Sequence, residues 1–161
     1  MLLRALIAFV ALPGIFAFLV PATIAMNTHQ PSQVGVPALF AFAVGVLALL
    51  WCVLAFYVTG KGTLAPWAPP ARLVTVGLYR FTRNPMYLAV LLVLAGWALA
   101  FQSLVLAGYA ALVAVAFHLR VVLGEEPWLA RTHGVQWQEY SQAVPRWLGL
   151  RYLHDAQRRD A

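Results

Sequence analysis

The sequence predicts an all-α fold, a polytopic membrane protein with four transmembrane helices in a single integral-membrane domain over residues 1–161. Three observations support this fold class. Hydrophobic residues form 63% of the chain and charged residues only 10%, whereas soluble domains carry about 25% charged residues. Long uncharged runs alternate with polar connections, and the basic residues fall in every second connection. A water-soluble globule and a disordered chain are therefore excluded.

The first two predicted helices are the uncharged runs 5–26 and 37–59. The first run has 22 residues. As a helix it reaches about 33 Å, enough to cross a hydrocarbon core of about 30 Å. A cleaved signal peptide is the alternative for this run. The run is longer than the usual apolar region of a signal peptide and lacks a clean Ala-x-Ala site, which favours a membrane helix.

The third uncharged run, 86–119, is too long for one crossing, because as a single helix it would reach about 51 Å. The polar pair Gln102-Ser103 lies near its middle and predicts a tight turn. The run then becomes a short helical hairpin, with helices over 85–101 and 104–123. A polar tail, 124–161, follows.

The distribution of charge sets the expected topology. No charged residue lies in connection 27–36 or in the Gln102 turn. Nearly all the basic residues lie in connection 60–84 and tail 124–161, and Arg4 precedes the first helix. The positive-inside rule makes the basic side cytoplasmic. We therefore expect a multi-pass protein with both termini in the cytoplasm, in a membrane such as the bacterial inner membrane.

Two kinds of partner are not expected. The net charge of +6 suits a nucleic-acid binder, but the basic residues form no stripe. The single cysteine, Cys52, and the four histidines match no metal-ligand spacing. Membrane lipids are the expected surroundings, and any chemistry is expected at the cytoplasmic face.

Glu125 and Glu126 are the most unusual polar residues, because they directly follow the predicted fourth helix. Acids are costly near a membrane, and the C-terminal end of a helix disfavours them. A compensating partner is therefore expected. The candidates are a bound cation or one of four arginines, Arg80, Arg83, Arg120 and Arg146. The alternative is a solvated tail with an internal salt bridge.

Two further motifs allow a structural and a functional interpretation. Asn84-Pro85 is typical of a helix start, with Asn as N-cap and Pro in the first turn. Such a helix start also attracts a carboxylate or phosphate. Gly60 and Gly62 surround Lys61 and indicate either a helix C-cap or a close approach by a ligand. A phosphate loop is excluded by the spacing.

These motifs, in their order, resemble the integral-membrane methyltransferases. The motifs are Gly-x-Gly-Thr from Gly60, Gly-x-Tyr-Arg-x-x-Arg-Asn-Pro-Met-Tyr ending at Tyr87, Glu-Glu-Pro-x-Leu from Glu125, and Val-Pro-Arg ending at Arg146. The superfamily includes isoprenylcysteine carboxyl methyltransferase and phosphatidylethanolamine N-methyltransferase. Asn-Pro-Met-Tyr is closer to the phospholipid enzymes, since the isoprenylcysteine enzymes have His in place of Asn84. Tyr140 and Val-Pro-Arg are closer to the isoprenylcysteine branch.

The resemblance implies an S-adenosylmethionine-dependent methyltransferase that acts on a lipophilic small molecule or a phospholipid. It implies that the cofactor-binding residues are Gly60, Gly62, Arg83, Asn84, Tyr87, Glu125 and Glu126. It also implies that Tyr140 and Arg146 close the site from the tail and, with Glu126, are the catalytic candidates. The alternative function is a non-catalytic four-helix membrane protein that binds lipid or a partner subunit.

Overall fold

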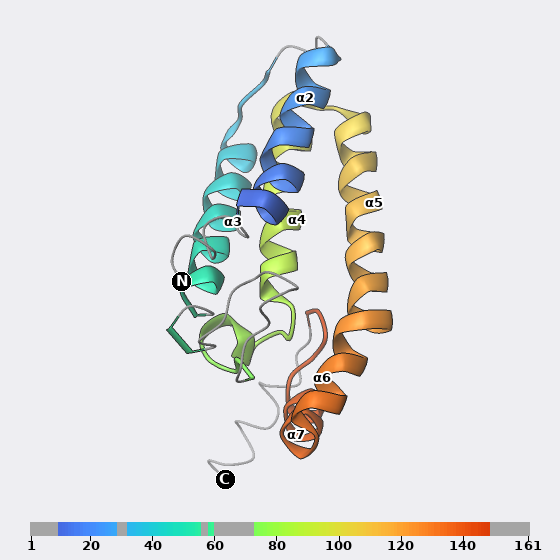
Figure 1. Cartoon of the computed structure of the whole chain (residues 1–161). Helices are drawn as coiled ribbons and strands as arrows, with labels where there is room; N and C mark the ends of the chain where they lie inside the picture. The colour runs from blue at the N-terminus through green and yellow to red at the C-terminus, as the bar shows by residue number, and fades with distance from the viewer. Residues whose placement is uncertain (1–9, 29–31, 56–57, 60–72, 149–161) are drawn as a thin grey trace.

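Helices make up all the regular structure in the residues that the computed structural model describes, which are 10–28, 32–55, 58–59 and 73–148 (Figure 1). Three of the elements are short or irregular: η1 and η4 are π-type, and η3 is a 3-10 turn. The elements, in chain order, are η1 (Val10–Leu19), α2 (Val20–Asn27), α3 (Val36–Ala55), η3 (Gly77–Arg80), α4 (Pro85–Phe101), α5 (Leu104–Arg120), η4 (Val121–Glu125), α6 (Glu126–His133) and α7 (Val135–Ala143).

The predicted hairpin is confirmed. α4 has the predicted bounds, and α5 starts at the predicted residue. Gln102 ends α4 in the left-handed conformation, with φ 45°. Ser103 then caps α5, because its hydroxyl accepts a hydrogen bond from the backbone nitrogen of Leu106 at 3.4 Å. The two polar residues therefore reverse the chain within one turn.

The first two helices agree with the prediction where they are described. η1 and α2 together form one helical stretch that continues to Asn27, and α3 lies within the predicted run 37–59 apart from its first residue. The predicted start of the first helix, 5–9, lies outside the described residues. Trp97 Nε1 donates to the carbonyl of Ala17 at 3.0 Å and ties η1 to α4.

The predicted end of the fourth helix at residue 123 is wrong. α5, η4 and α6 form one continuous helical stretch from Leu104 to His133. Gly124 and Pro127 are residues that usually end a helix. The wide π-type turn η4 leaves room for the ring of Pro127, which has no backbone N–H to donate. The stretch ends at Gly134, which has φ 49°. Glu125 and Glu126 therefore lie within a helix and not at its negative end.

α3 and α4 are the most closely packed pair of helices. Gly45 of α3 lies directly against α4, since a Cβ there would come within 2.9 Å of the backbone nitrogen of Val93 and 3.0 Å of the carbonyl oxygen of Ala89. Leu49 and Leu94 are among the buried residues that form the core beside this contact. α4 lies between α3 and α5 (Figure 1), and fewer residues of α5 than of α4 are buried.

The polar residues are divided between two ends of the bundle. At one end, Gln102 Nε2 donates to Gln33 Oε1 at 2.8 Å, so the two uncharged connections meet. The segment before α4, together with α6 and α7, lies at the opposite end (Figure 1).

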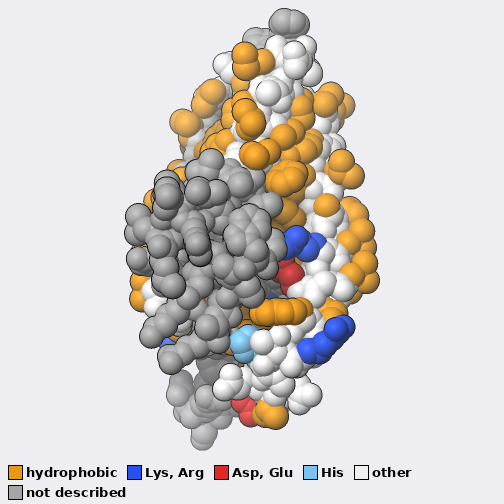
Figure 2. All heavy atoms as spheres, in the orientation of Figure 1, with side chains coloured by type: hydrophobic (Ala, Val, Ile, Leu, Met, Phe, Trp, Pro, Cys, Tyr) orange, Lys and Arg blue, Asp and Glu red, His pale blue; other side chains and the backbone are white. Residues whose placement is uncertain are grey.

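Hydrophobic side chains cover much of the described surface between these ends, whereas the visible charged side chains lie in the lower half of the view (Figure 2). Two helices are long and apolar enough to cross a membrane by length and composition, Val36–Ala55 and Leu104–His133. Gly14–Asn27 and Pro85–Phe101 are shorter apolar helices. The described chain therefore offers a surface suited to lipid.

Candidate functional site

The segment 73–84 leads into α4 through the short turn η3. Gly77 begins this turn with φ 62°, and a Cβ there would come within 2.8 Å of Trp51 Nε1. The positive φ therefore favours glycine here, and a Cβ would also displace the indole of Trp51. Tyr79 is buried in the turn. The turn delivers residues 82–84 to the N-terminal end of α4.

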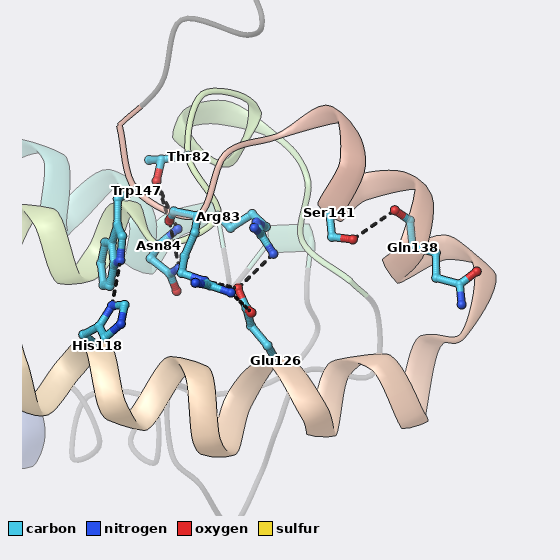
Figure 3. A network of polar contacts seen from close by, with 9 residues as sticks. Thr82, Arg83, Asn84, His118, Glu126, Gln138, Ser141 and Trp147 are labelled. Atoms are coloured by element: carbon cyan, nitrogen blue, oxygen red, sulfur yellow. Dashed lines mark hydrogen bonds and ion pairs between the residues drawn. The ribbon is translucent and has the colours of Figure 1, made fainter.

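Glu126 is the centre of an ion-pair cluster that joins three distant segments (Figure 3). Nη1 of Arg83 donates to its Oε1 at 2.8 Å. Arg146 donates from Nε to Oε1 at 2.8 Å and from Nη2 to Oε2 at 2.7 Å. The side chains of Arg83 and Glu126 are only 13% and 15% exposed. Arg83 and Glu126, together with the more exposed Arg146, thus form a partly buried charge network, which we call the Glu126 cluster.

The residues after α7 reach this cluster as a non-helical segment, 144–147, which we call the strap. Its backbone is bound to the residues before α4. The backbone nitrogen of Arg83 donates to the carbonyl of Pro145 at 2.9 Å. The carbonyl of Arg146 accepts from Thr82 Oγ1 at 3.2 Å and from Asn84 Nδ2 at 2.9 Å. The strap is therefore attached by its backbone on one side, while the Arg146 side chain extends to α6 on the other.

Asn84 occupies the N-cap position of α4, but its side chain makes no capping hydrogen bond. The interpretation of Asn84 as a side-chain cap is therefore wrong. Its amide is directed to the strap, as the contact to the Arg146 carbonyl shows (Figure 3). The predicted position of Pro85 in the first turn of the helix is confirmed.

Glu125 forms a second cluster with Arg120 and Tyr87, which we call the Glu125 cluster. Arg120 Nε donates to Glu125 Oε1 at 2.8 Å, and the Tyr87 hydroxyl donates to the same oxygen. The Tyr87 ring packs on Phe117 of α5, with ring centroids 4.4 Å apart. Because Glu125 and Arg120 are one-third and one-half exposed, this cluster is open to solvent or ligand.

Tyr140 of α7 contacts the turn η3 next to the Glu126 cluster. Its hydroxyl donates to the carbonyl of Tyr79 at 2.8 Å and so binds α7 to η3. Burial raises the pKa of Tyr140, and the nearby Arg83 opposes that rise. The guanidinium of Arg83 also lies 5.5 Å from the ring centroid of the buried Trp137. Tyr140 is thus a neutral hydrogen-bond donor beside the Glu126 cluster.

Arg83 is the least exposed of the three arginines in the two clusters. Burial lowers its pKa, and the carboxylate of Glu126 opposes that shift. Among the described residues, no hydrogen-bond partner reaches its buried Nε. The two clusters together hold three guanidiniums and two carboxylates, a net charge of one positive. The surplus positive charge favours the binding of an anionic group.

The strap has one further side-chain contact. Trp147 Nε1 donates to Nδ1 of His118 on α5 at 3.2 Å, and the two rings are nearly stacked. Together with the contact between Arg146 and Glu126, this bond places the strap across the interval from the start of α4 to the α5–α6 stretch (Figure 3).

Most of the site residues inferred from the sequence come together at one end of the bundle. The Glu126 cluster contains Arg83, Glu126 and Arg146, with Asn84 at its edge, and the Glu125 cluster contains Tyr87 and Glu125. Tyr140 contacts the same region through η3. Gly60 and Gly62 lie outside the described residues.

The expected compensation of the two acids by arginines is confirmed. Three of the four candidates, Arg83, Arg120 and Arg146, pair with Glu125 or Glu126, while Arg80 is exposed on η3. Thr82 is a site residue that sequence reasoning missed. A threonine shortly before a predicted helix is a common cap residue, so nothing in the sequence singled it out.

Comparison with known proteins identifies the family. The model of the phospholipid methyltransferase family matches residues 34–136, which is more than half of the chain. Neither the curated proteins nor the solved structures give a match. The matched region contains α3 to α6 with both glutamates, and it ends before Tyr140 and the strap. This protein, with its paired carboxylates held by arginines at one end of an apolar helical bundle, belongs to the phospholipid methyltransferase family.

Proposed function

We propose that this protein is an S-adenosylmethionine-dependent methyltransferase that acts at the inner face of the membrane on a lipophilic or lipid acceptor. The observation that carries the proposal is the convergence of Arg83, Glu126 and Arg146 from three segments in a member of this family. S-adenosylmethionine supplies a methyl group bound to a positively charged sulfur. Methyl transfer from it depends mainly on orientation, which a partly buried network of fixed charges favours.

The residues of the two clusters fit the charges of this cofactor. The partly exposed carboxylate of Glu125 and the carboxylate of Glu126 would bind its ammonium group and ribose hydroxyls. Arg83, whose buried Nε has no partner among the described residues, and the N-terminus of α4 would bind its carboxylate. Tyr87 would orient Glu125 through their hydrogen bond.

The acceptor would approach from the strap side. Arg146 and Tyr140 lie there, and both are hydrogen-bond donors. They would orient an anionic or polar group of the acceptor next to the methyl donor. The match of Asn-Pro-Met-Tyr to the phospholipid enzymes and the family model both favour a phospholipid or a similar lipophilic amphiphile.

For the membrane arrangement, we propose four crossings, with the first from η1 and α2 and the others from α3, α4 and α5. Pro85–Phe101 has 17 residues and reaches only about 25 Å. Such a short helix recesses its end into the headgroup region of the inner leaflet. A site at that end would accept a soluble cofactor from the cytoplasm and a lipid from the side.

A non-catalytic role remains the competing function, and one observation favours it. All the charge of Glu126 is already neutralised by two guanidiniums, as in a purely structural network. Calorimetric titration of the detergent-purified protein with S-adenosylmethionine separates the two functions. A methylating enzyme binds this cofactor and then transfers a labelled methyl group to a component of a lipid extract. A protein that binds no cofactor under these conditions is not the enzyme proposed here.

A further inference from the structure

We infer that Thr82 is a positioning residue, whose hydroxyl holds the strap backbone so that the Arg146 guanidinium meets Glu126. This inference rests on the proposed function, because it gives Thr82 a task within that site. Thr82 is 6% exposed and is, with Ser103, one of two buried polar residues in the described chain. Ser103 caps α5, whereas the Thr82 hydroxyl bonds to a residue 64 positions further along the chain.

The Thr82 hydroxyl bridges two segments that must be aligned. It donates to the carbonyl of Arg146 at 3.2 Å and accepts from the backbone nitrogen of Asn84 at 3.3 Å. A hydroxyl provides one donor and two acceptor sites, so a single side chain satisfies both groups. The oxygen thereby fixes the backbone of Arg146 relative to the residue that begins α4.

The position of Arg146 matters because its two parts have different partners. The backbone carbonyl is bound by Thr82 and Asn84 before α4, and the guanidinium is bound by Glu126 on α6. A bidentate contact between Arg and a carboxylate has strict geometry, so a shift of the Arg146 backbone misaligns it. Thr82, which does not touch Glu126 in the described contacts, therefore acts on that carboxylate through Arg146.

A double-mutant cycle tests this route. Thr82→Val keeps the shape of the side chain and removes both hydrogen bonds, Thr82→Ser restores them, and Arg146→Met removes the guanidinium. The readout is the affinity for S-adenosylmethionine by calorimetry in detergent, with a thermal melt of each variant beside it. Ser141→Ala is the matched control, because it removes another hydroxyl bond to a carbonyl, that from Ser141 to Gln138 on α7.

We expect Thr82→Val to weaken cofactor affinity roughly 2- to 10-fold, the effect of a misplaced hydrogen bond, and Thr82→Ser to recover it. Arg146→Met weakens affinity as well. The variant with both Thr82→Val and Arg146→Met then binds as Arg146→Met alone, and Ser141→Ala binds as the unmodified protein. If Thr82→Val yields no folded protein, Thr82→Ala takes its place in the cycle with the same expected result.

Two results overturn the inference while leaving the proposed function intact: cofactor affinity unchanged by Thr82→Val, or losses that simply add in the variant with both changes. Additive losses would mean that Thr82 acts independently of Arg146. An unmodified protein that binds no S-adenosylmethionine overturns the proposed function and this inference together. The two failures are therefore distinguished by the unmodified protein alone.

Discussion

The guanidinium of Arg146 binds both oxygens of the Glu126 carboxylate, with Nε 2.8 Å from Oε1 and Nη2 2.7 Å from Oε2. This contact joins the strap to α6 across 20 residues of sequence. Arg83 adds a third hydrogen bond to the same carboxylate. Removing one acid therefore affects two arginines, one of which is nearly buried.

Glu126→Gln should lower both stability and cofactor affinity. The change leaves Arg83 without its neutralising charge in a poorly solvated position, which costs about 1–3 kcal/mol of unfolding free energy. Loss of a charge-assisted hydrogen bond to S-adenosylmethionine should weaken affinity roughly 10- to 150-fold. Thermal melting and calorimetric titration measure the two effects. Glu139→Gln, the same change at an exposed position of α7, should alter neither. A lower melting temperature with unchanged affinity would limit Glu126 to a structural role.

Asn84→Asp tests how much the contact from the Asn84 amide to the strap stabilises the protein. Asp is as good an N-cap residue as Asn, and its charge is favoured at a helix N-terminus. It lacks the amide N–H that Asn84 donates to the Arg146 carbonyl. We therefore expect Asn84→Asp to be destabilised by about 1 kcal/mol in a chemical or thermal melt. If Asn84→Asp melts like the unmodified protein, the amide contact to the strap contributes no stability.

Stability should fall in alkaline solution because of two tyrosines. Burial raises the pKa of Tyr79 well above the ordinary value of 10.0, and burial also raises the pKa of Tyr140. An unfolded tyrosine loses its proton near that ordinary value, while the folded protein keeps it. Above about pH 10 the unfolded state binds fewer protons, so stability that is complete below this pH decreases as pH rises toward the folded pKa values.

Tyr140→Phe tests this alkaline behaviour. Melting temperatures measured from about pH 8 to about pH 11 should decline less steeply in Tyr140→Phe than in the unmodified protein. At the lower pH the variant should already be less stable, because the hydrogen bond to Tyr79 is lost. Equal slopes in the two proteins would show that Tyr140 ionises as easily when folded as when unfolded.

The proposed topology can be tested at Ser32, an exposed residue in the connection between α2 and α3. In a protein with Cys52→Ala, Ser32→Cys should react with a membrane-impermeant reagent in intact cells. Gln138→Cys, exposed on α7 at the other end of the bundle, should react only after permeabilisation. The reverse pattern would invert the topology, and labelling of both in intact cells would contradict a spanning arrangement.

The hairpin of α4 and α5 could be predicted from the sequence because its signals are local. Uncharged runs set the helices, and the polar pair Gln102-Ser103 supplies a left-handed residue followed by an N-cap. The end of the fourth helix could not be predicted in the same way. Gly124 and Pro127 usually end a helix, and only the wide turn η4, which has no clear sequence signal, carries the chain past them.

The candidate site was partly predictable for a similar reason. Two adjacent acids beside apolar sequence require compensation, and three of the four expected arginines provide it. Which arginine meets which acid depends on the path of the strap. That path is set by bonds to a backbone carbonyl from Thr82 and Asn84, and contacts between residues so distant in sequence leave no periodic pattern.

The wide turn η4 also determines where the chain can change in length. A single π-type turn holds one more residue than a regular turn of α-helix. Deletion of Gly124 can therefore be absorbed by regularising the turn, with α6 and Glu126 left in place. Deletion of Gly108, equally open to solvent or lipid but in the regular part of α5, would instead rotate all that follows by about 100°. Two glycines with similar surroundings thus differ sharply in how dispensable they are.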